Sequence, residues 1–126
     1  MIKSLFFVAL GGALGSSTRY ILSVSIAKIV GIKYPFGTQF VNILGCLLLG
    51  IIIALYDKDL LHSGSLKLFL TVGFCGGFTT FSTFALENVQ LLKNGDLFGF
   101  FVYSLSSVIL GMATLAAAYQ LIKSFT

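Results

Sequence analysis

Charged residues are scarce in this sequence of 126 residues. Lys and Arg number eight and Asp and Glu four, or 10% of the chain, against 57% hydrophobic residues and a mean hydropathy of +1.03. A soluble domain needs a polar exterior, and so few charged side chains cannot cover one. The composition therefore excludes a soluble globular protein and predicts an integral membrane protein.

Proline, histidine and cysteine are also nearly absent. Pro35 is the single proline, which leaves glycine as the main source of helix irregularity. His62 has no partner at a metal-binding spacing, and Cys46 and Cys75 each stand alone in an apolar run, as small reduced thiols do. The sequence contains no phosphate-binding G-x-x-x-x-G-K-[ST] loop, no paired acids and no basic run. These absences argue against an enzyme, a pump driven by ATP or protons, and a nucleic-acid-binding protein.

Long apolar stretches make up most of the chain. They cover approximately residues 4–29, 35–56, 66–92 and 97–122. Each exceeds the length of about 20 residues that crosses a hydrocarbon core of about 30 Å. The connections between them are short, and Asn94-Gly95 marks the last one as a tight turn. The sequence thus predicts an all-α membrane protein, in which residues 1–126 form a single domain of four transmembrane helices.

The lysines give almost no signal for orientation. An even number of spans places both termini on one side, together with Lys3, Lys58, Lys67 and Lys123. The opposite side carries Lys28, Lys33 and Lys93. The positive-inside rule depends on an imbalance of basic residues, which is nearly missing here. Two interpretations stay open: a chain that inserts both ways round, which would permit an antiparallel homodimer, or a fixed orientation set by other features.

Several polar residues lie at membrane depth, where each needs a partner or a function. Thr38 and Asn42 share a face of the second span, and Tyr103 and Ser107 share a face of the fourth, with Thr114 farther along. Thr38 and Asn42 are explained either by a hydrogen bond between helices or by a polar path through the protein. The hydroxyls of the fourth span either bond back to carbonyls of their own helix or line such a path.

Two ionisable residues also fall inside spans. Arg19 closes the motif GGALGSSTRY of the first span, where it could reach the membrane interface or pair with carbonyl groups or an anion. Glu87 is the only acid within a span, and near the end of the third span it could face water or a vestibule.

The segment GFCGGFTTFSTF, residues 73–84, is unusual for a transmembrane helix. The pairs Gly76-Gly77 and Thr79-Thr80 both disfavour a continuous helix. One interpretation is a helix break near mid-membrane, whose freed backbone groups would need protein, water or an ion as partners. The other is an unbroken helix whose small residues allow close packing.

Phenylalanines recur at every third position of this segment, at Phe78, Phe81 and Phe84, and hydroxyl residues surround them. A phenylalanine stripe usually contacts lipid or the protein core. However, aromatic rings carry a positive edge, and the edges of two rings could help an anion to shed water.

Four segments together resemble the small microbial fluoride channels of the Fluc or CrcB family. They are GGALGSSTRY, FGTQFVNILGCLLLG, GFCGGFTTFSTF and YSLSSVILG, and the resemblance extends over nearly the whole chain. It implies a multi-pass channel of the bacterial plasma membrane that exports fluoride passively. It also implies an antiparallel homodimer with two pores and a break in each third helix.

The resemblance assigns roles to individual residues. It implies a structural Na⁺ at the dimer centre, held by the backbone carbonyls of Gly76 and Thr79. The fluoride pore would comprise Phe81, Phe84, Asn42, Ser82, Thr83, Thr38, Tyr103 and Ser107. Gly111 has no hydroxyl one turn after Ser107, so the polar track is either shorter here or resumes at Thr114.

Two other functions remain as alternatives. A small dual-topology exporter of lipophilic cations would need a carboxylate deep in a helix, but the first two spans have none and Glu87 lies late in the third. A membrane assembly protein without transport would explain the small residues but not the cluster of phenylalanines and hydroxyls.

Overall fold

The computed structural model describes residues 1–125, and all regular structure in this range is helical. Four helical segments are long and apolar enough to cross a membrane: α1 (Ile2–Val30), α2 (Phe36–Asp57), a composite third span (Gly64–Lys93) and α6 (Leu97–Phe125). They correspond to the four expected stretches, with ends that differ by a few residues. The prediction of four long apolar helices is confirmed.

The third span is interrupted, as one of the two interpretations predicted. It consists of α3 (Gly64–Leu68), η1 (Phe69–Cys75), α4 (Gly76–Phe78) and α5 (Phe81–Lys93). The break lies at Thr79 and Thr80, whose backbones are extended, with φ −89° and ψ 159° and with φ −150° and ψ 117°. The preceding glycines stay helical. The β-branched residues mark the break because their side chains suit extended backbone better than a helix.

Helix η1 is a π-helix, a feature that the sequence analysis missed. Its seven residues, Phe69–Cys75, follow the wider i→i+5 hydrogen-bond pattern that is common near functional sites. The segment contains one glycine, Gly73, which is buried, and its sequence does not distinguish a π-helix from an α-helix.

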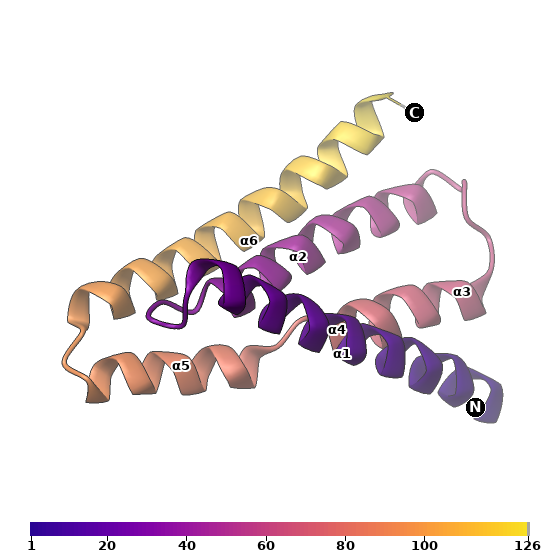
Figure 1. The fold of residues 1–126 in the computed structure, drawn as a ribbon. Coiled ribbons are helices and arrows are strands. Elements are labelled where there is room, and N and C mark those ends of the chain that lie inside the picture. Colours follow the sequence, from indigo (N-terminus) through magenta and orange to yellow (C-terminus); the bar gives the residue numbers. More distant parts are fainter. Residues whose placement is uncertain (126) are drawn as a thin grey trace.

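The helices run in alternate directions along the molecule. Figure 1 shows both termini and the α2–α3 connection at one end, and the α1–α2 and α5–α6 connections at the other. Helices α2 and α6 lie side by side, and α1 crosses in front of η1 and α4. Helix α5 extends away from the break and packs chiefly against α6. The third span therefore changes neighbours at its interruption.

Glycines bring α1 and the first half of the third span into backbone contact. Gly11 and Gly15 are buried; Gly11 lies against Gly73, and Gly15 lies against the backbones of Phe74 and Phe78. A Cβ atom on Gly73 would lie 2.9 Å from Gly11 Cα, and one on Gly77 would lie 2.7 Å from the Gly12 carbonyl oxygen. Both glycine pairs, each with a spacing of four residues, are therefore close-packing sites, as in other membrane helices.

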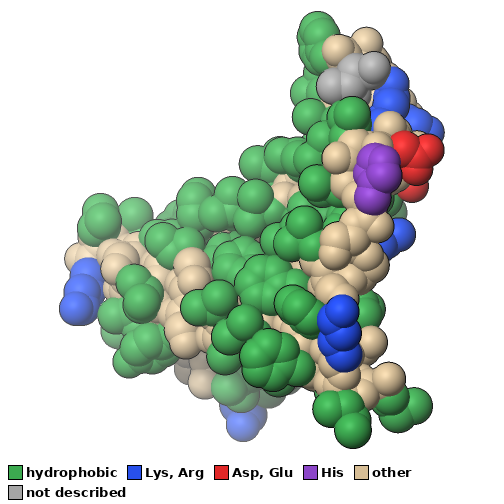
Figure 2. All heavy atoms as spheres, turned by 90° about the vertical axis from the view of Figure 1, so that its right-hand side faces the viewer, with side chains coloured by type: hydrophobic (Ala, Val, Ile, Leu, Met, Phe, Trp, Pro, Cys, Tyr) green, Lys and Arg blue, Asp and Glu red, His purple; other side chains and the backbone are tan. Residues whose placement is uncertain are grey.

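The protein exposes most of its large apolar side chains and buries few. Among residues 1–125, the largest fully buried side chains are those of Val41, Phe78 and Tyr103. Figure 2 views the right-hand side of Figure 1, where hydrophobic side chains dominate the surface and charged ones lie at its margins. An apolar exterior is what a protein surrounded by lipid requires.

Candidate functional site

The break in the third span is closed by a side chain from α2. The Thr80 amide donates to Asn42 Oδ1 at 2.7 Å, and Asn42 Nδ2 donates to the Thr80 carbonyl at 3.1 Å. A single amide side chain thus replaces both helical hydrogen bonds that Thr80 gives up. Of the two explanations for Asn42, the structure shows the hydrogen bond between helices.

The ends of the two half-helices have their own partners. Arg19 Nε donates to the Gly77 carbonyl at 3.1 Å, which is the carbonyl pairing considered for this residue. The Thr79 amide and Thr79 Oγ1 both donate to the Cys75 carbonyl at 3.0 Å. Thr80 Oγ1 accepts from the Thr83 amide at 3.2 Å and so caps α5, as hydroxyls commonly do at helix starts. Within residues 1–125, the carbonyl oxygens of Gly76 and Thr79 accept no hydrogen bond.

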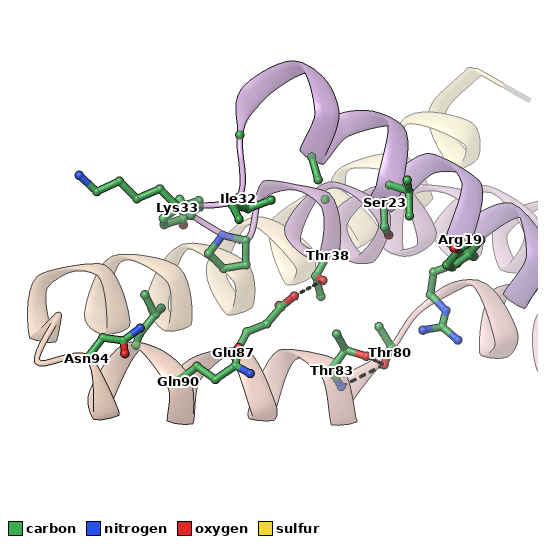
Figure 3. A pocket seen from close by; sticks show the side chains of 18 residues that line it. Arg19, Ser23, Ile32, Lys33, Thr38, Thr80, Thr83, Glu87, Gln90 and Asn94 are labelled. Carbon is green, nitrogen blue, oxygen red and sulfur yellow. Dashed lines mark hydrogen bonds between the residues drawn. The ribbon is translucent and has the colours of Figure 1, made fainter.

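Two cavities meet at Thr80, which lines both. The larger cavity, of about 480 Å³, is bounded by α1, α2 and α5, and its wall includes Arg19, Lys33, Thr38, Thr83 and Glu87 (Figure 3). The smaller cavity, of about 360 Å³, lies between α2, the third span and α6, and its wall includes Asn42, Cys46, Cys75, Gly76, Thr79, Phe81, Phe84 and Ser107.

The carboxylate of Glu87 is held firmly in the larger cavity. Thr38 Oγ1 donates to Glu87 Oε1 at 2.7 Å, and the Tyr103 hydroxyl donates to Glu87 Oε2 at 2.6 Å. Figure 3 shows Glu87 reaching from α5 toward Thr38, while Arg19 descends from α1 near Thr80. Hydrogen bonds to a charged group are among the stronger ones in proteins, so this cluster fixes α5 to α2 and α6.

Aromatic rings connect the two cavities. The Phe81 and Phe84 ring centroids are 5.9 Å apart at an interplanar angle of 42°, and the Phe84 and Tyr103 centroids are 5.0 Å apart. Phe81 is 79% exposed, whereas Tyr103 is fully buried. Tyr103 therefore supports Phe84 with its ring and Glu87 with its hydroxyl.

The structure distributes the predicted pore residues between the two cavities and the region between them. Asn42, Phe81, Phe84 and Ser107 line the smaller cavity, and Thr38 and Thr83 line the larger one. Tyr103 lies between them, and Ser82, exposed and 3.4 Å from Thr80 Oγ1, lines neither. Thr114 also lines neither cavity, so the structure does not extend the polar track to it.

Two polar residues of this region were missed. Gln39 Nε2 donates to Ser106 Oγ at 2.6 Å. Asn88 is buried, accepts from Ser104 Oγ at 2.7 Å, and donates through Nδ2 to the Phe84 carbonyl at 2.9 Å. The signal available in the sequence was their position inside apolar spans, where amide side chains need partners.

Comparison with known proteins identifies the relatives of the chain. The family model described as "CrcB-like protein, Camphor Resistance (CrcB)" matches residues 6–119. The chain belongs to the CrcB family. The resemblance found in the four sequence motifs is thereby confirmed.

Curated CrcB relatives match nearly the whole chain. A protein of Phocaeicola vulgatus is 47% identical over 111 residues, which cover 88% of this chain and 91% of that protein. A protein of Leptospira interrogans is 42% identical over 98% of this chain and 97% of its own, and one of Nitrobacter winogradskyi is 40% identical over 92% of each. All three are named fluoride-specific ion channel FluC. Together with the four apolar helices, these matches identify a multi-pass membrane protein of a channel family rather than an enzyme.

Proposed function

We propose that this chain forms a fluoride-selective channel that exports fluoride passively across the plasma membrane. The observation that carries the proposal is its near full-length match, at 40–47% identity, to proteins named fluoride-specific ion channels. HF crosses membranes and releases F⁻ in a less acidic cytoplasm. An inside-negative potential then drives the anion outward with about 2.3 kcal/mol per 100 mV, so no other energy source is needed.

The proposed path runs past the phenylalanines of the smaller cavity. Phe81 and Phe84 lie side by side there, with Asn42 and Ser107 on the same wall. Positive ring edges and weak hydrogen-bond donors at several depths suit a small anion that must enter and leave quickly. Because Asn42 also pairs with Thr80, it would both hold the break and border the path.

The larger cavity is the proposed vestibule of this path. It holds Thr38 and Thr83, and it meets the smaller cavity at Thr80. Arg19 adds a positive charge to its wall, and the Glu87 carboxylate is engaged by two hydroxyl donors. This arrangement reduces the repulsion that a free carboxylate would exert on fluoride. Ser82 would reach the path from the exposed side of α5.

A structural Na⁺ fits the break. Hard cations take oxygen ligands, and the carbonyl oxygens of Gly76 and Thr79 are without a hydrogen-bond donor from residues 1–125. One chain supplies two such oxygens, so an antiparallel pair of chains would supply four around a shared ion. The cation would join the two interrupted spans.

The antiparallel homodimer rests on two further features. The basic residues are almost balanced between the two ends, and Phe81 is largely exposed in one chain although it is proposed to line the path. A second copy would cover this ring. Cross-linking of singly labelled chains from opposite membrane faces tests the arrangement, and uniform labelling from one face contradicts it.

The alternative of a cation exporter is not favoured by the site. Such a protein needs a carboxylate that is free to bind a lipophilic cation. Both oxygens of Glu87 instead accept hydrogen bonds at 2.6–2.7 Å.

Ion efflux from liposomes tests the proposed function. Purified protein is reconstituted with internal potassium fluoride, valinomycin is added, and external fluoride is recorded with an ion-selective electrode. Fluoride leaves the protein-containing vesicles and stays in empty ones, while a parallel sample loaded with chloride shows no comparable release. Retained fluoride, or equal release of both halides, contradicts the proposal.

A further inference from the structure

Two free thiols line the smaller cavity. Cys46 comes from α2 and Cys75 from η1, and neither forms a disulfide. Cys75 is only 3% exposed, and Cys46 is partly buried beside Gly111 of α6, whose added Cβ would lie 3.4 Å from the sulfur. The two cysteines therefore line the same cavity.

The helix register brings these two cysteines to neighbouring levels of α2 and the third span. Asn42 on α2 is hydrogen bonded to Thr80 of the third span, which fixes how the two antiparallel segments align. Cys46 lies one turn beyond Asn42, on the same face of α2. Because the two segments are antiparallel, residues after Asn42 lie beside residues before Thr80. Cys75 lies just over one turn before Thr80 and is therefore at about the same level as Cys46.

A pair of thiols without other ligands selects a particular class of metal ion. Structural Zn²⁺ requires four ligands, and no group of three or more His, Cys, Asp or Glu side chains suited to a metal occurs within residues 1–125. Soft cations such as Cu⁺ favour thiolate sulfur, and two sulfurs suffice for linear coordination. Each thiol would release its proton to water on binding.

We propose that Cys46 and Cys75 form a two-thiolate site for a soft monovalent cation such as Cu⁺ or its stable analogue Ag⁺. The site shares its cavity with Phe81 and Phe84. A bound cation occupies this space and therefore lowers fluoride flux. The effect on flux rests on the proposed channel function, whereas metal binding does not.

Titration with Ag⁺ tests the site directly. Detergent-purified full-length protein in chloride-free nitrate buffer is titrated in a calorimeter, with Cys46→Ser and Cys75→Ser as variants. Thr71→Val is the matched control, because Thr71 lines the same cavity but bonds to its own helix at the Lys67 carbonyl. The wild type and Thr71→Val bind one Ag⁺ per chain, and each serine variant binds about 100-fold more weakly. Mutation of a residue that only supports a metal ligand already lowers metal affinity by up to about 100-fold, so removal of a ligand has at least that effect.

Several outcomes decide the proposal. Wild-type affinity in Cys46→Ser overturns it, and so does the absence of Ag⁺ binding to the wild type. If the buried Cys75→Ser variant does not fold, Cys46→Ser alone gives the answer. In fluoride-loaded liposomes, Ag⁺ slows efflux through the wild type and not through Cys46→Ser. Wild-type vesicles that release no fluoride even without Ag⁺ contradict the channel function, and the titration then still decides the metal site.

Discussion

The two halves of the third span are held by different kinds of contact. The first half, residues 64–78, packs its backbone against α1 through Gly73 and Gly77. The second half, α5, is joined to α2 and α6 by side chains, through the bonds of Glu87 and Asn88. The interruption lets one span provide a rigid support at one end and a polar, phenylalanine-bearing wall at the other.

Replacing Asn42 removes the two hydrogen bonds that close the break in the third span, and it has the largest expected effect. Asn42→Leu leaves the Thr80 amide and carbonyl unpaired at membrane depth, at a cost of about 1–3 kcal/mol for each group. Thermal unfolding in detergent shows a large loss of stability, and fluoride efflux from liposomes is abolished.

Asn42→Asp distinguishes the role of this residue in stability from its proposed role in conduction. Aspartate keeps an acceptor for the Thr80 amide, so it is less destabilising than leucine, but its charge repels fluoride and blocks conduction. Normal efflux through both variants shows that Asn42 does not line the path and that its two hydrogen bonds to Thr80 are not needed for conduction.

Adding a methyl group to the first half tests its backbone packing. A Cβ on Gly15 would overlap the Phe74 carbonyl oxygen and lie 2.9 Å from the Phe78 amide nitrogen. Gly15→Ala therefore lowers the unfolding free energy by about 1–3 kcal/mol, as measured by thermal denaturation. Gly12→Ala is the matched control, since its Cβ would meet nothing nearer than 4.0 Å; equal stability of the two variants contradicts the packing account.

Changing a ring on the second half tests the anion path with little effect on the fold. Phe81 is largely exposed within one chain, and isoleucine keeps an apolar surface for the proposed second copy, so Phe81→Ile leaves the unfolding temperature nearly unchanged. Loss of a favourable ring edge, at about 0.5–1.5 kcal/mol, slows fluoride efflux by up to about tenfold. Efflux at the wild-type rate removes the aromatic role of Phe81.

The smallest effect is expected at the contact between α5 and α6. Ser104→Ala removes the 2.7 Å bond to Asn88, and hydrogen bonds between membrane helices average about 0.6 kcal/mol. The unfolding temperature falls slightly and efflux stays near the wild-type rate. A loss of stability as large as that of Gly15→Ala contradicts the distinction between the two halves.

Length and hydropathy were sufficient to predict the four helices, because the thickness of the hydrocarbon core sets the length of a span and its apolar character sets the hydropathy. A break in the third span was also predictable, but its position was not, because both the glycines and the threonines of GFCGGFTTFSTF disfavour a continuous helix. The structure places it at Thr79 and Thr80, since Gly76 and Gly77 are needed as helical residues and Gly77 packs against α1.

The partners across the site could not be predicted from the sequence. The bonds from Arg19 to Gly77 and from Gln39 to Ser106 join residues far apart in the chain, and local spacing carries no information on them. The same holds for the division of the site into two cavities. The pore roles of Phe81, Phe84 and Ser82 stay predictions that conduction measurements must test.

A reversal potential in a planar bilayer tests the central claim most directly. Under a tenfold fluoride gradient with equal chloride on both sides, a fluoride-selective pathway gives a current that reverses at about 59 mV, the fluoride equilibrium potential. A reversal near zero, or no current from folded protein, contradicts the account.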